Sequence, residues 1–165
     1  MEAFLNELPN LAEEKRVENV KFFKRLKKRT PKNLDVVMQG LHADEFEKTD
    51  CMTCGNCCKT TSPIFTEKDI QRISKHLKLK ETAFISTYLD RDLDDFFVLK
   101  SAPCSFLDLR DNSCFIYDVR PKACKEYPHT DRRKFIQIAP LTIKNTEICP
   151  AVYNIVERLK EKMNR

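Results

Sequence analysis

Apolar positions at helical spacing mark both ends of the chain. The first helical segment begins at Pro9 and Asn10, ends near Thr30, and has apolar positions at Leu11, Val17, Val20, Phe23 and Leu26. A second segment follows, with apolar positions at Leu34, Val37, Met38, Leu41 and Phe46. Together they predict an antiparallel helical pair leading into the central region. Pro150 opens the last predicted helix, whose apolar side carries Val152, Ile155, Val156, Leu159 and Met163.

The central region predicts shorter elements. Thr66 suits a helix N-cap and Asp69 the third helical position, so a helix with an apolar face at Ile70, Ile73 and Leu77 should follow. Residues 81–89 predict another short helix and residues 96–99 a strand. The acidic run 90–95 between them lacks the glycine and the terminal glutamate of an EF-hand loop, and we expect a solvated turn there.

Residues 105–109 and 114–117 flank a polar turn and predict a hairpin. Pro121 should begin a helix, and residues 135–143 read as a strand that Pro140 confines to an edge or ends. The predicted fold class is therefore α+β and mostly α: a small helical domain with a short hairpin. We divide it into a basic helical pair (1–50), a cysteine-rich domain (51–150) and a C-terminal helix packed on the same core (151–165).

The composition is that of an ordinary globular protein. No stretch is apolar for the length that a transmembrane helix needs. The first residues lack the basic and apolar regions of a secretory signal. We therefore expect a cytoplasmic protein that does not contact a membrane.

Cysteine gives the chain its most specific signal. The eight cysteines are Cys51, Cys54, Cys57, Cys58, Cys104, Cys114, Cys124 and Cys149. The first four form a Cys-x2-Cys-x2-Cys-Cys run. A reducing cytoplasm favours metal binding over disulfides, and the adjacent pair Cys57-Cys58 could close only a strained disulfide ring. We therefore interpret all eight as metal ligands around which the fold is organised.

The spacing favours metal without choosing it. A turn at Gly55 or a continuous helix would each bring the first four sulfurs to one face. Cys57 and Cys58 leave consecutive backbone atoms and more naturally serve two ions, or two irons of one cluster. Two four-thiolate zinc sites, an iron–sulfur cluster with a zinc, and a single four-iron (4Fe-4S) cluster with four structural thiols all remain open. Cations near the cysteines in sequence could screen the thiolate charge or be ordinary surface groups: Lys59, Arg120, Lys122 and Lys125.

Three blocks, residues 51–58, 103–108 and 114–128, carry a family resemblance. The chain resembles the CxxCxxCC cysteine-cluster family, also called YkgJ-like, over about residues 51–150. Lys125 stands where that family commonly has arginine. The resemblance implies a chelated zinc or iron and no established reaction. Some relatives lie within flagellin lysine methylases, where an iron–sulfur role has been considered.

Tyr117, Arg120 and Tyr127 allow two interpretations. Arg120 could clamp an anionic substrate while the tyrosines donate protons beside the metal. We favour the structural interpretation, in which Arg120 binds carbonyls or Asp118 and the tyrosine rings pack over sulfur, because no acid–base partner is visible. His42, His76 and His129 are not needed as ligands beside eight thiols.

Nine basic residues and a single acid, Glu18, lie between Lys15 and Lys32, in a chain of net charge +5. We favour a solvated helix face over a phosphate-binding surface, because no nucleic-acid motif accompanies it. The leading hypothesis is a cytoplasmic zinc or iron protein without identified catalytic residues. The alternatives are an iron–sulfur or zinc enzyme, related by analogy to lysine methyl transfer, and a zinc-scaffolded module that binds nucleic acid or protein.

Overall fold

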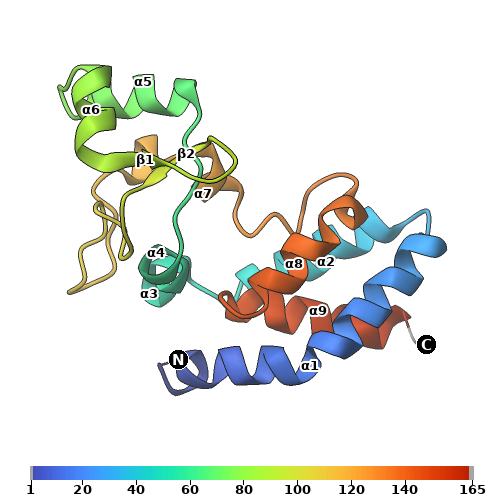
Figure 1. The fold of residues 1–165 in the computed structure, drawn as a ribbon. Helices are drawn as coiled ribbons and strands as arrows, with labels where there is room; N and C mark the ends of the chain where they lie inside the picture. The colour runs from blue at the N-terminus through green and yellow to red at the C-terminus, as the bar shows by residue number, and fades with distance from the viewer. Residues whose placement is uncertain (1, 164–165) are drawn as a thin grey trace. The chain divides into compact units, whose positions relative to one another are not determined.

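The computed structural model describes residues 2–163 and divides into two compact units (Figure 1). Unit 1 consists of two separate segments, residues 1–50 and 128–165, and unit 2 of residues 51–127. In this division residues 128–150 group with the terminal helices, whereas the sequence-based division keeps them with the cysteine-rich region. Unit 2 is therefore an insertion within unit 1.

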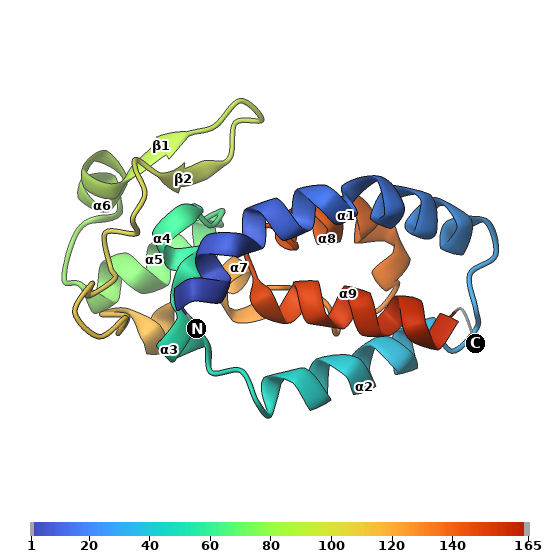
Figure 2. The ribbon, with the colours of Figure 1, turned by 90° about the horizontal axis from the view of Figure 1, so that it is seen from below.

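All the secondary-structure elements of unit 1 are helices over its described residues. Its elements are α1 (Glu2–Lys28), α2 (Leu34–Phe46), the 3-10 helix η2 (Phe135–Ile138), α8 (Ala139–Asn145) and α9 (Pro150–Met163). α9 packs against both α1 and α2 and lies between them (Figure 2). The predicted helical pair is thus an arrangement of three helices, completed by a helix more than one hundred residues further along the chain.

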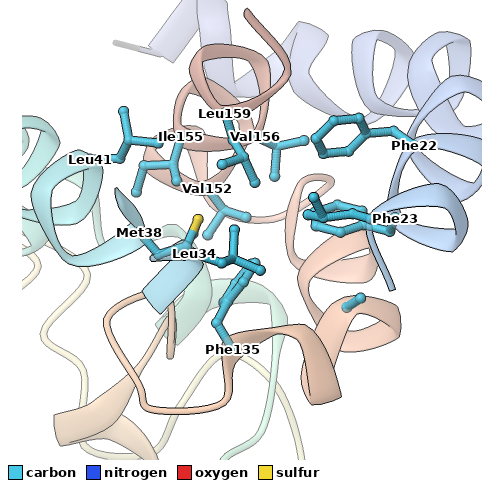
Figure 3. Close-up of a cluster of buried hydrophobic side chains, with 12 residues drawn as sticks. Phe22, Phe23, Leu34, Met38, Leu41, Phe135, Val152, Ile155, Val156 and Leu159 are labelled. Carbon is cyan, nitrogen blue, oxygen red and sulfur yellow. The ribbon is translucent and has the colours of Figure 1, made fainter. Parts of the chain in front are cut away.

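The core of unit 1 forms around α9 (Figure 3). Four fully buried α9 side chains occupy its centre: Val152, Ile155, Val156 and Leu159. They meet Leu34, Met38 and Leu41 of α2 on one side and Phe22 and Phe23 of α1 on the other. Phe135 closes this core from η2, with its ring centroid 6.1 Å from that of Phe23.

α1 differs from the prediction in its start and its buried face. It begins at Glu2 and continues through Pro9, which we expected to open it. Val17 and Val20 are 64% and 47% exposed, whereas Leu8 and Asn19 are buried. The two valines lie outside the buried face that the helical repeat defines, so apolar character alone did not predict which residues of α1 are buried.

The strand predicted over residues 135–143 is wrong, because η2 and α8 occupy this segment. β-branched residues suggested a strand, but Pro140 falls in the first turn of α8, where its missing N–H removes no helical hydrogen bond. α8 buries Ala139, Thr142 and Asn145, which recur every three residues and therefore share one face of the helix.

Unit 2 consists of short elements. These are α3 (Cys51–Cys54), α4 (Asn56–Thr60), α5 (Glu67–His76), α6 (Glu81–Tyr88), β1 (Leu89–Arg91), β2 (Phe97–Leu99), the 3-10 helix η1 (Tyr117–Val119) and α7 (Lys122–Glu126). Its core residues are Phe65, Ile70, Ile73, Phe84, Leu89, Leu99, Phe106 and Ile116. The predicted capping box is confirmed, because the Thr66 side chain accepts from the Asp69 N–H while the Asp69 carboxylate accepts from the Thr66 N–H.

The two-stranded sheet of unit 2 lies earlier in the chain than the predicted hairpin. β1 and β2 pair antiparallel, with Leu89 opposite Leu99. The turn between them forms because the Asp92 carboxylate accepts hydrogen bonds from the N–H groups of Asp94 and Phe96. The predicted hairpin over residues 105–117 contains only an isolated bridge between Leu107 and Cys114. The α+β, mostly α fold class is confirmed.

Over residues 2–163, no helix has both the length and the apolar character needed to cross a lipid bilayer.

Candidate metal centre

The first four cysteines lie on two short helices separated by Gly55. α3 ends at Cys54 and α4 begins at Asn56, while Gly55 adopts a left-handed conformation with φ of 57°. Its N–H donates to the Cys51 carbonyl at 2.8 Å. The run therefore combines both conformations considered from sequence, a turn and helix.

Asn112, in the loop before Cys114, packs against this turn. Its side-chain amide donates to the Thr53 carbonyl at 3.0 Å. A Cβ atom on Gly55 would lie 2.9 Å from Asn112 Cγ, closer than side chains tolerate. Glycine is thus required at position 55 by both the backbone conformation and the packing.

Cys104 is joined to the first cysteine block by its backbone. Its N–H donates to the Cys58 carbonyl at 2.8 Å, which brings together residues 46 positions apart. The Phe106 N–H then lies 3.4 Å from Cys104 Sγ and donates to it. Such N–H···S bonds stabilise a thiolate and are common around metal-bound sulfur.

A carboxylate and a guanidinium on α5 hold the segment between Cys114 and Cys124. Arg72 donates to the carbonyls of Val119 and Arg120 at 3.2 and 2.8 Å and pairs with Asp69 at 2.6 Å. Asp69 also accepts from the Lys122 N–H at 3.1 Å. We did not predict this role of Arg72, because nothing in the sequence marks a partner nearly fifty residues away.

The thiols of Cys58, Cys104, Cys114 and Cys124 influence one another electrostatically. Burial, together with the charges of Cys58 and Cys114, raises the pKa of Cys104 to about 11. Burial also raises the pKa of Cys124 to about 12, with contributions from the other three thiols. The pKa of Cys114 is raised by burial and by Cys58. Thiols from four separate segments therefore lie in one electrostatic neighbourhood.

Cys58 differs from the other three thiols. A hydrogen bond with the Cys57 side chain lowers the pKa of Cys58 to about 7, against the opposing effect of burial. The positive charge of Lys59 also lowers this pKa. The adjacent cysteines thus interact directly, and Lys59 supplies some of the expected charge screening.

Arg120 binds a backbone carbonyl, which is one part of the structural interpretation. Its guanidinium donates to the Tyr117 carbonyl at 2.6 Å and lies over the Tyr117 ring, 3.9 Å from the centroid. Its charge opposes the upward shifts of the Cys114 and Cys124 pKa values. Lys122 pairs with Glu126 at 3.5 Å.

The structure distributes the eight predicted ligands over both units. Seven lie in unit 2, where Cys51 is exposed and Cys54 buried. Cys149 lies in unit 1, packs against its apolar core and donates its N–H to the Asn145 carbonyl. None of the eight forms a disulfide. Within residues 2–163, no three His, Cys, Asp or Glu side chains are arranged so that they could hold one metal ion.

The donor chemistry of unit 2 nevertheless suits a thiophilic metal. Four thiols interact electrostatically, and one sulfur accepts a backbone N–H. Zinc and iron–sulfur centres use thiolate sets of this kind.

Comparison with known proteins agrees with this chemistry. A family model named CxxCxxCC, with the description "Putative zinc- or iron-chelating domain", matches residues 50–150. An 82-residue segment, 48% of this chain, is 33% identical to "Uncharacterized protein MJ0661" of Methanocaldococcus jannaschii and spans 44% of that protein's length. No solved structure matches the chain. Because the family match covers more than half of the sequence, the protein belongs to the CxxCxxCC family.

Proposed function

We propose that unit 2 binds zinc or iron, with the thiolates of Cys58, Cys104, Cys114 and Cys124 as its central ligands. The observation that carries this proposal is the common neighbourhood of these four thiols. They come from four segments, and the Cys104 N–H···O=C bond to Cys58 joins the first two directly. A bound cation would stabilise the thiolate form that burial disfavours, and metal uptake would release protons.

The proposed role of the metal is structural. α3, α4 and α7 have four or five residues each, too few to be stable as isolated helices. They contain a single buried residue, Cys54. Tetrahedral thiolate coordination of a bound metal would connect these segments. An iron–sulfur cluster would in addition supply electron transfer.

The remaining cysteines fit a second ion or the second half of a cluster. Cys57 interacts with Cys58 and, as its sequence neighbour, is suited to a second metal position. Cys51 and Cys54 flank the same turn. The eighth cysteine, Cys149, belongs to unit 1, and its membership of the eight-thiolate set rests on the sequence alone. A reducing cytoplasm would keep such thiols available for metal.

Metal analysis of protein purified without oxygen tests the proposal. We expect stoichiometric zinc or iron in the wild type and its loss in Cys104→Ala and Cys124→Ala. Ser105→Ala changes an exposed neighbour and should retain the metal. Visible absorption separates a coloured iron centre from colourless zinc. Wild-type protein without stoichiometric metal, or retention of all metal in both cysteine variants, would contradict the proposal.

The same measurement resolves the number of ions. If eight thiolates hold two ions, Cys149→Ala removes one equivalent and leaves the ion bound by the four central thiolates. Unchanged metal content in Cys149→Ala would limit the site to cysteines of unit 2.

A further inference from the structure

The charges of α1 divide sharply along the helix. Its acidic residues, Glu2, Glu7, Glu13, Glu14 and Glu18, all precede Asn19. The chain from residue 19 to residue 33 has seven basic residues and no acid. Those seven are exposed: Lys21, Lys24, Arg25, Lys27, Lys28, Arg29 and Lys32. Basic side chains at a helix C-terminus also interact favourably with the helix dipole. This effect explains only the basic residues of the last turn of α1.

Ion pairing separates the two halves further. Lys15 pairs with Glu18 at 3.3 Å, and Arg16 pairs with Glu13 at 3.4 Å. Over residues 2–163, by contrast, no acidic side chain pairs with the lysines of the second half or with Arg29. The basic surface is therefore shorter than the Lys15–Lys32 segment read from sequence.

The fold adds a second basic segment to this surface. The Asp35 carboxylate, at the start of α2, accepts hydrogen bonds from the N–H groups of Lys134 and Phe135 at 2.7 and 3.1 Å. Phe135 also packs on Phe23 of α1. These contacts hold Arg132, Arg133 and Lys134 beside the α1–α2 connection, one hundred residues away in sequence.

Arg132, Arg133 and Lys134 are exposed, and among the described residues none of them forms an ion pair. The acids next to these basic residues in sequence are Asp35, whose oxygens accept the backbone N–H groups, and the exposed Asp131. Glu161, in the last turn of α9, is also exposed. We call this surface, formed by the seven basic residues of 21–32 together with Arg132, Arg133 and Lys134, the basic end of unit 1.

We propose that the basic end of unit 1 binds the phosphodiester backbone of double-stranded nucleic acid. Lys21, Lys24 and Lys28 follow one another about every turn, or 5.4 Å, and so offer a row of charges. A duplex presents about one negative charge per 1.7 Å of its axis. This line of charges matches a row of exposed cations better than a single small anion would. Among the described residues none of these three lysines forms an ion pair, so they are available for phosphate.

The apolar groups at this end argue for the duplex backbone over bases or lipid. Phe22 and Phe23 are 5% and 2% exposed and point toward α9 (Figure 3). The exposed apolar side chains of this part of α1 are Val17 and Val20. Stacking on unpaired bases and insertion into a membrane interface both use exposed aromatic or bulky apolar groups. Binding should therefore be independent of base sequence.

Fluorescence anisotropy with the full chain tests this assignment. The probes are labelled DNA and RNA duplexes of about 20 base pairs, titrated in salt from about 50 to 200 mM. The logarithm of the binding constant should fall linearly with the logarithm of salt concentration, by about 0.9 per phosphate contacted. Binding to either duplex supports recognition of the phosphodiester backbone that DNA and RNA share. A preference for one duplex identifies which of the two nucleic acids the surface binds.

Two double variants and a matched control locate the surface. Arg132→Gln with Arg133→Gln, and Lys24→Gln with Lys28→Gln, should each lower the salt slope by about 2. Lys75→Gln with Lys80→Gln removes the same charge from exposed positions of unit 2 and should leave the slope unchanged. Circular dichroism verifies that all three remain folded, and the wild-type slope provides a readout that needs no variant.

Three results would overturn the proposal. The first is no binding of the wild type to either duplex at the lowest salt. The second is an equal loss in the unit 2 control. The third is tighter binding to single strands, or to phosphatidylserine vesicles, than to duplexes.

Discussion

Phe135 of unit 1 and Phe84 of unit 2 are both completely buried, yet the elements around them differ greatly in length. Unit 1 is formed by helices of 27, 13 and 14 residues that share one apolar core. The longest helix of unit 2, α5, has ten residues. Five of its cysteines lie on helices of four or five residues, and Cys104 and Cys114 lie outside any helix or strand. Apolar burial can account for unit 1, whereas in our proposal a metal ion connects the cysteine segments of unit 2.

Removing the metal should have the largest effect and separate the two units. Structural zinc contributes about 10 to 16 kcal/mol in small zinc domains, so a strong chelator should unfold residues 51–127. α1, α2 and α9 should keep most of the helical signal, because their core contains no cysteine segment of unit 2. Hydrogen exchange read by mass spectrometry can follow each segment separately.

Loss of protection throughout both units on chelation would show that unit 1 also depends on the metal. Unchanged protection of residues 51–127 in metal-free protein would show that unit 2 needs none. Either outcome would end the distinction drawn between the units.

Truncating the two buried phenylalanines compares the apolar cores directly. Phe135→Ala and Phe84→Ala should each cost about 3 to 5 kcal/mol, because each leaves a cavity in a packed core. We expect Phe84→Ala to weaken metal affinity and Phe135→Ala to leave it unchanged. Denaturant unfolding and competitive metal titration measure the two effects, and Val17→Ala, at an exposed position, is the control. Equal effects of both variants on metal affinity would contradict the separation.

The two glycines should respond in opposite directions to alanine. Gly55→Ala places a Cβ against Asn112 and forces alanine into a left-handed conformation, which costs about 1 to 2 kcal/mol before the clash is counted. Gly40 lies within α2, and a Cβ added there would meet nothing beyond its own helix backbone within 4 Å. Gly40→Ala should therefore stabilise the helix by about 0.5 to 1 kcal/mol. Chemical denaturation monitored by circular dichroism distinguishes the signs. Destabilisation by both would mean that α2 does not tolerate a methyl group there.

Acid should weaken unit 2 through Asp69. Burial alone would raise the pKa of Asp69, but hydrogen bonds from Thr66, Arg72 and the Lys122 N–H outweigh it and lower that pKa. The ionised carboxylate therefore contributes its full stability above the unfolded pKa of about 3.9, and this contribution is lost as pH falls through the lower folded value.

Asp69→Asn should flatten this acid dependence, measured as the free energy of unfolding against pH. Thr66→Ala, which removes the N-cap oxygen, should cost about 1 kcal/mol at neutral pH. A wild-type profile with no acid loss beyond that of Asp69→Asn would contradict the role of this carboxylate.

Local signals allowed part of the fold to be predicted from sequence. Thr66 and Asp69 define a helix start through their own hydrogen bonds, and Pro150 marks the first position of α9. The strand prediction for residues 135–143 was wrong because β-branched side chains are also compatible with a helix when one face of that helix is buried. We predicted the hairpin too far along the chain. The acidic run around Asp92 was interpreted as a solvated turn and not as the connection between two strands.

The candidate site was predictable in composition and less so in arrangement. The cysteine run identified unit 2, and the left-handed turn follows from Gly55. Arg72, which holds the segment before Cys124, gave no signal because its partners are backbone carbonyls far along the chain. The approach of residues 132–134 to α2 was equally hidden, since it depends on a carboxylate that binds backbone N–H groups.

The insertion of unit 2 within unit 1 sets an order for biosynthesis. α1 and α2 leave the ribosome with their apolar faces uncovered, and all of residues 51–127 emerge before α9 can cover them. Unit 2, being continuous, can fold and acquire its metal during this interval, because domains generally fold as units during synthesis. Chaperones that recognise exposed apolar helices would encounter the nascent chain most readily in the same interval.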